Sequence, residues 1–110
     1  MNHKLFRGSL DTIIFKLLSQ NGSMYGYEIT KKVKELSDDH FKITEGALYP
    51  ALHKLESKGL LNTETKNIGN RLRKYYSLTE NGQKEVSVKM EEMVSFINNL
   101  QTVLNLKSTS

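Results

Sequence analysis

The sequence predicts a mainly α-helical chain with one small β-hairpin, and three observations lead to this fold class. Apolar residues recur with a helical period in three successive stretches, at residues 9–21, 25–36 and 44–58. Residues 60–78 alternate with a period of two, which is typical of strands. Residues 79–105 then return to a helical period. The expected order is therefore three helices, a hairpin and a final long helix.

The first two helices are expected within residues 9–36. Ser9 is a plausible N-cap for the first, and Gly22 suits a left-handed residue after its end. The apolar face of this helix consists of Leu10, Ile13, Ile14, Leu17 and Leu18. The second helix is expected to begin around residues 25–27 and to bury Ile29, Val33 and Leu36. A short extended stretch is expected at residues 41–43.

Thr44 is expected to cap the third helix, which ends before Gly59. Its apolar face consists of Leu48, Leu52 and Leu55. Pro50 conflicts with this prediction, because proline removes one backbone hydrogen bond and bends a helix. Since the leucine period continues through Pro50, we retain the helix and expect a distorted first turn.

The hairpin is expected to pair residues 60–66 with residues 71–78 through a turn at residues 67–70. Two strands alone are marginally stable, so this ribbon must pack on the helices. Tyr75 and Tyr76 are expected to serve sheet and core packing.

The last helix should run from Thr79 to about Asn105, and it contains a heptad seam. The apolar residues of the seam are spaced 4, 3, 4, 3 and 4 apart, as in a coiled coil. They are Val86, Met90, Met93, Ile97, Leu100 and Leu104. The seam could pack on the first helix of its own chain or on a second copy. The long seam and its additional apolar residues favour a homodimer. Met90, Met93 and Phe96 could instead hold an apolar ligand, although seam packing is the simpler role.

Charge is distributed unevenly along the 110 residues, whose net charge is +4. Residues 1–80 contain 13 Lys and Arg side chains against 9 Asp and Glu, whereas residues 81–110 contain 3 of each. The whole excess therefore lies in the first part, which suits an anionic partner. There is no cysteine, and the three histidines are scattered, so no catalytic site, metal site or cofactor is expected. No apolar run could span a membrane and no signal peptide is recognisable, so we expect a cytoplasmic protein.

The predicted order of elements is that of a winged helix-turn-helix with an appended helix. In such a domain the second helix crosses the DNA backbone, and the third enters the major groove. The hairpin forms the wing, on which Arg71 and Arg73 share a face while Lys74 points the other way. The candidate DNA-binding residues are Tyr25, Tyr27, Thr44, Gly46, Tyr49, His53, Lys54, Arg71, Arg73 and Lys74. As alternatives, Tyr49 could pack inside, His53 could be merely exposed, and the wing cations could only guard an edge strand against aggregation.

Three ordered motifs resemble the short form of the bacterial PadR family of transcriptional regulators. They are Met24–Ile29, Glu45–Leu52 with Leu55-Glu56 and Gly59-Leu60 after it, and Arg71–Gly82. With Gly8-Ser9-Leu10 the match covers about residues 8–82. The resemblance implies a homodimeric repressor that is dimerised by its last helix, and it accounts for Pro50. It also implies that the effector, where one exists, is a small hydrophobic or aromatic compound. One departure is His53, which stands where the family often has lysine or arginine.

We therefore expect a winged helix DNA-binding domain at residues 1–80, a dimerisation helix at 81–106 and a disordered tail at 107–110. The expected function is a sequence-specific, ligand-responsive repressor that binds a palindromic operator in double-stranded DNA as a homodimer. The alternative is a protein-interaction adaptor whose basic face meets an acidic protein.

Overall fold

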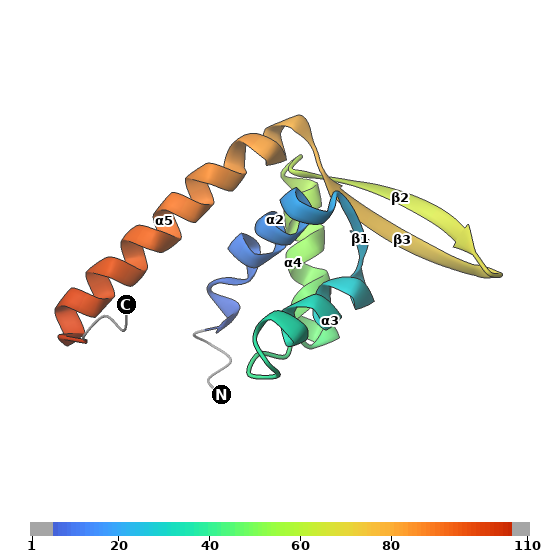
Figure 1. Ribbon diagram of the computed structural model, residues 1–110. Helices are drawn as coiled ribbons and strands as arrows, with labels where there is room; N and C mark the ends of the chain where they lie inside the picture. The colour runs from blue at the N-terminus through green and yellow to red at the C-terminus, as the bar shows by residue number, and fades with distance from the viewer. Residues whose placement is uncertain (1–5, 107–110) are drawn as a thin grey trace.

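The computed structural model describes residues 6–106, which form helices around a small antiparallel sheet (Figure 1). In chain order the elements are α2 (Leu10–Asn21), β1 (Ser23–Tyr25), α3 (Gly26–Leu36), α4 (Glu45–Ser57), β2 (Leu61–Ile68), β3 (Arg71–Leu78) and α5 (Glu80–Leu104). The fold class expected from the sequence is confirmed. The expected tail at 107–110 lies outside the described residues.

The hydrophobic core lies where α2, α3, α4 and the base of the sheet meet. α2 runs through the middle of the molecule, between α5 and α4 (Figure 1). The most deeply buried side chains are Ile14, Phe15, Leu18, Ile29, Leu48, Leu52, Leu55 and Tyr76. The apolar faces predicted for the first and third helices thus supply most of the core, as does the inner face of α3.

The sheet has three strands in the order β1-β3-β2, all antiparallel. β1 was missed by the sequence reasoning, because a strand of three residues shows no alternation and its partner lies some fifty residues away. Met24 of β1 pairs with Tyr76 of β3. The hairpin turn is tighter than expected, because Ile68 already pairs with Arg71. Gly69 and Asn70 alone form the loop, with φ of 54° and 67°, as a two-residue turn of this kind requires.

α2 begins differently from the prediction. Ser9 precedes it, but its backbone lies near the helical region, with φ −100° and ψ −1°, and its side chain makes no cap bond. The reason is that the chain already turns before Ser9, whose N–H donates to the carbonyl of Phe6. At the other end Gly22 has a positive φ of 81°, and its N–H donates to Leu18.

One further prediction for residues 25–43 is wrong, because Leu36 is not buried. It is 68 % exposed, since it is the last residue of α3 and lies beyond the core that Ile29 and Val33 reach. Residues 41–43, where an extended stretch is expected, belong to no helix or strand in the described structure. Phe41 instead stacks on Phe6, with ring centroids 4.8 Å apart, and Ile43 is buried.

α4 follows its prediction closely. The Thr44 hydroxyl accepts a hydrogen bond from the N–H of Ala47 at 3.2 Å, which makes Thr44 the N-cap. The helix continues without interruption through Pro50 to Ser57. Pro50 is exposed on the side away from the core.

α5 begins at a tight joint with the rest of the fold. The Thr79 hydroxyl accepts from the N–H of Gly82 at 3.0 Å and donates to the carbonyl of Gly59 at 2.7 Å. Gly82 is buried against the Leu60 backbone, where an added Cβ would clash with the carbonyl group. The end of α4 and the start of α5 are thereby held together, and the direction of α5 is set.

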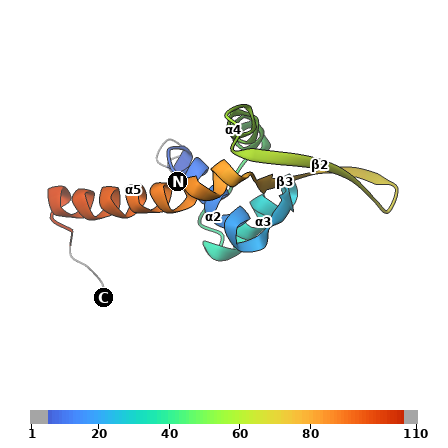
Figure 2. The same cartoon turned by 90° about the horizontal axis from the view of Figure 1, so that it is seen from above.

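The molecule is elongated, with extents of 53 × 30 × 24 Å. α5 projects from one end and the β2–β3 hairpin from the other (Figure 2). Within residues 6–106, no helix is long and apolar enough to cross a membrane.

Candidate nucleic-acid interface

α4 presents one polar face to solvent. Its three leucines are buried, so the residues between them face outward. Thr44 before the helix and Gly46, Tyr49 and His53 within it are exposed. The structure thus brings four of the predicted DNA-binding residues onto one side of α4.

Tyr49 joins this face to the start of α3. Its ring lies directly over Gly26, and a Cβ built on Gly26 would come within 2.9 Å of the ring carbon Cζ. Any larger residue would therefore displace the ring. Tyr49 remains 37 % exposed. Tyr49 therefore packs on α3 through one part of its ring, and the remainder of the side chain faces solvent.

Arg73 lies against an aromatic ring of β1. Its guanidinium is over the ring of Tyr25, 4.4 Å from the centroid, and the side chain is only half-exposed. Arg71, at the tip of the hairpin, is exposed. Within the described residues neither arginine forms an ion pair. Both positive charges therefore remain available to an external anion.

A hollow of about 310 Å³ separates α4 from the wing. Tyr25 and Gly26 form one wall, Tyr49 and His53 another, and Arg73 lies on the wing side. The remaining lining residues are Leu72, Lys74 and Tyr76. Five of the ten predicted DNA-binding residues meet at this hollow.

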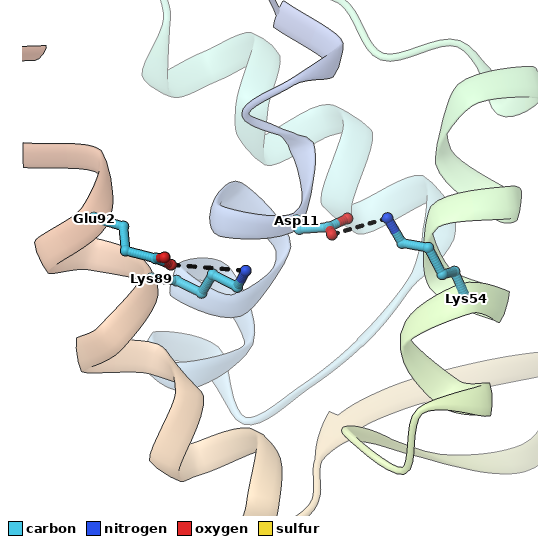
Figure 3. Close-up of polar contacts among 4 residues, drawn as sticks. All are labelled: Asp11, Lys54, Lys89 and Glu92. Carbon is cyan, nitrogen blue, oxygen red and sulfur yellow. Dashed lines mark ion pairs between the residues drawn. The ribbon is translucent and has the colours of Figure 1, made fainter. Parts of the chain in front are cut away.

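The two lysines among the predicted residues have acidic partners in the fold. Lys54 of α4 lies 3.0 Å from the Asp11 carboxylate of α2 (Figure 3). Lys74 of β3 lies 3.7 Å from Glu56 of α4. Both lysines are about half-exposed, so these pairs are weak. The sequence reasoning did not find these partners, because each pair joins elements that are distant along the chain.

Tyr76 is the buried tyrosine among the residues that line the hollow. Burial raises the pKa of its hydroxyl, and the nearby Glu56 carboxylate and Tyr49 raise it further. Tyr76 is 1 % exposed, so its role is in the core, as predicted.

Tyr27 completes the tyrosine cluster at the start of α3. Its ring stacks on Tyr25, with centroids 6.4 Å apart, and is 63 % exposed. Glu28 accepts a hydrogen bond from the backbone N–H of Tyr25, so this helix terminus already has an acidic partner. The groups accessible at the start of α3 are therefore the side chains of Tyr25 and Tyr27 rather than its backbone N–H groups.

The sequence of this chain matches a known protein family. The model of the family described as "Transcriptional regulator PadR-like family" matches residues 14–88, which include α4 and the whole wing. The chain belongs to the PadR-like family. It is therefore a transcriptional regulator, of a family of DNA-binding proteins that are not enzymes.

Solved structures of similar proteins share the whole fold. A transcriptional regulator from Clostridium thermocellum is 31 % identical, with a TM-score of 0.82, over 93 % of this chain and 96 % of the other. A PadR family transcriptional regulator from Eggerthella lenta is 30 % identical, with a TM-score of 0.77, over 94 % and 88 %. The negative transcriptional regulator PadR of Bacillus subtilis is 33 % identical over 63 % of this chain but only 38 % of its own length. The likeness to the Bacillus protein thus concerns one part of that longer chain.

Outside the interface, a second hollow of about 380 Å³ lies between α2, α3 and α5. Met90 and Met93, two of the three residues named for a possible effector, line it together with Ile13, Leu17 and Phe41. Phe96 is not among its lining residues and is 59 % exposed. In the part of the chain described, no three acidic or histidine side chains gather as metal ligands would.

Proposed function

We propose that this PadR-like regulator represses transcription by binding a palindromic operator as a homodimer. The observation that carries the proposal is the hollow where the exposed face of α4 meets the half-buried Arg73 of the wing. A helix that lies in the major groove places the adjacent phosphate backbone between itself and the wing. Tyr49, His53 and Arg73 surround that space. Thr44 and Gly46 at the start of α4 are then nearest the base edges.

The proposal of a dimer is supported by α5. Val86 packs against the core, and Met90 and Met93 face α2, so the first half of the predicted seam is used within the chain. Ile97, Leu100 and Leu104 are 45 %, 40 % and 55 % exposed on the projecting half. Exposed apolar residues at helical spacing favour burial against a second copy.

A homodimer also suits the DNA geometry. Two reading helices about 34–36 Å apart would meet half-sites one turn apart on the same side of the duplex. The repressor sign is supported by the Bacillus subtilis relative, which is a negative regulator.

The hollow lined by Met90 and Met93 is proposed as the site of a small hydrophobic or aromatic effector. Its volume of about 380 Å³ suits a small molecule. Since both methionines belong to the same helix as the exposed seam, an occupant would act on the dimer. Aromatic compounds titrated into the protein–DNA complex test this, because an effector must shift the DNA affinity.

The function is tested by a gel shift of the full chain on duplex DNA from the region upstream of its own gene. Binding to this duplex is expected to withstand an excess of random duplex. Equal competition by random DNA would contradict sequence-specific regulation. Failure to bind any duplex, together with capture of an acidic protein, would instead favour the adaptor alternative.

A further inference from the structure

The Tyr25 ring contacts the wing rather than open solvent. It is half-buried, and the Arg73 guanidinium covers one part of it at 4.4 Å from the centroid. The edge of Tyr75 from the same strand approaches it with centroids 5.3 Å apart and an interplanar angle of 70°. Tyr25 and Tyr75 also pair directly in the sheet. The ring is therefore held from two sides before any ligand arrives.

Arg73 is the wing cation that lies over the Tyr25 ring. Arg71 is exposed at the hairpin tip, and Lys74 is paired with Glu56 and lies over the ring of Tyr76, 5.5 Å from its centroid. Lys66 lies over a different ring, that of Tyr75, 4.5 Å from its centroid. A flexible arginine loses side-chain freedom when it binds a phosphate, whereas one already stacked on an aromatic face has lost much of it.

We propose that Tyr25 is a positioning residue, which holds the Arg73 guanidinium at the wall of the hollow so that it meets a DNA phosphate already ordered. The inference rests on the proposed DNA-binding function and deepens it. Tyr25 then acts on DNA through Arg73, instead of contacting DNA by itself. Its ring is what matters, so phenylalanine can replace it.

The test is a double-mutant cycle on the full chain, measured by fluorescence anisotropy on the labelled upstream duplex at low salt. Tyr25→Leu is expected to weaken binding about two- to five-fold, the range of an exposed cation–π contact. In the Arg73→Ala background the same substitution should have no further effect. In the matched Lys66→Ala background its full effect should remain. Tyr25→Phe should bind like the wild type.

Three results would overturn the inference. One is wild-type affinity in Tyr25→Leu. Another is an equal loss with and without Arg73, since this would mean direct contact or a folding defect. The third is a loss in Tyr25→Phe as large as in Tyr25→Leu, which would assign the role to the hydroxyl.

NMR separates this inference from the function on which it rests. In the free protein, the Arg73 side-chain protons should be shifted upfield by the Tyr25 ring and should lose that shift in Tyr25→Leu. If the shift is present and the wild type binds no duplex, the proposed function is wrong. If the wild type binds DNA but the shift is absent, the positioning role alone is wrong.

Discussion

At Gly26, the absence of a side chain lets two parts of the interface touch. The Tyr49 ring of α4 occupies the space in which a Cβ would lie. This contact sets the spacing between the start of α3 and the exposed face of α4. Gly46, in the first turn of α4, has nothing within 4 Å of its Cβ position and so provides a natural comparison.

We expect Gly26→Ala to be less stable than Gly46→Ala by about 1 kcal/mol, because its added methyl group displaces the far end of the partly exposed Tyr49 ring. Gly46→Ala should leave stability unchanged or raise it by up to about 1 kcal/mol through helix propensity. Urea denaturation of both variants measures the difference. If Gly26→Ala were as stable as Gly46→Ala, the packing of Tyr49 on α3 would be wrong.

Tyr76 predicts a change of stability at alkaline pH. Its pKa in the folded protein is raised, chiefly by burial, above the ordinary value near 10 of the unfolded chain. Its contribution is therefore fully present below about pH 10 and is lost as the pH rises through the folded pKa. Denaturation curves from about pH 9 to about pH 11 should show a smaller decline for Tyr76→Phe than for the wild type. Equal declines would contradict the raised pKa.

Among the elements, the joint between α4 and α5 connects the candidate interface to the projecting helix. Thr79 makes two hydrogen bonds there with a single hydroxyl, one within α5 and one to Gly59. The close approach of Gly82 to the Leu60 backbone leaves little room for α5 to tilt.

Thr79→Val removes both bonds and keeps the shape of the side chain. We expect a loss of about 1–2 kcal/mol in the free energy of unfolding, the range for a helix N-cap. Thr102→Val, which removes an exposed bond to Asn98 on the same helix, should cost less than about 0.5 kcal/mol. Chemical denaturation measures the loss in each variant. Equal losses would mean that the Thr79 bonds stabilise the fold no more than the exposed Thr102 bond does.

The regular elements were largely predictable because their signals are local. The leucine period gave the core face of α4, and alternation with a Gly-Asn turn gave the hairpin, although its loop is two residues shorter than expected. β1 and the exposure of Leu36 were not predictable, since both depend on which distant element lies alongside. The cap expected at Ser9 failed because the turn before it is invisible to a periodicity argument.

In the candidate site too, local features were predictable and contacts between distant elements were not. The residue types and the face of α4 follow from sequence spacing, but the partners do not. Nothing in the sequence links Lys54 to Asp11, or Arg73 to Tyr25, because these contacts join elements far apart along the chain. The number of free cations at the interface is therefore a property of the fold.

In the whole molecule, the β2–β3 hairpin and the end of α5 project in opposite directions and expose different kinds of side chain (Figure 2). The wing carries cations at one end, and the last turns of α5 expose apolar residues at the other (Figure 2). Under the proposed function, a single copy would supply one of the two DNA-reading helices and one of the two apolar faces of the dimer. Dimerisation would complete both.

We expect Ile97→Asp with Leu100→Asp to produce monomers that bind the upstream duplex weakly, because two charges would be buried in the seam. The matched control is Asn98→Asp with Asn99→Asp, which lie between the two seam positions, and it should leave the dimer intact. Light scattering measures the mass of each variant. A dimer that survived in the seam variant would show that α5 is not the interface.

The salt dependence of DNA binding shows whether the wing, beside α4, forms part of the DNA interface. Each phosphate contact contributes about one unit to the slope of log affinity against log salt. Arg71→Ala with Arg73→Ala should therefore weaken binding to all duplexes and flatten the slope by about two units per chain. Lys84→Ala with Lys89→Ala removes the same charge from α5 and should leave the slope unchanged. An unchanged slope in the arginine variant would mean that the wing does not contact DNA phosphates.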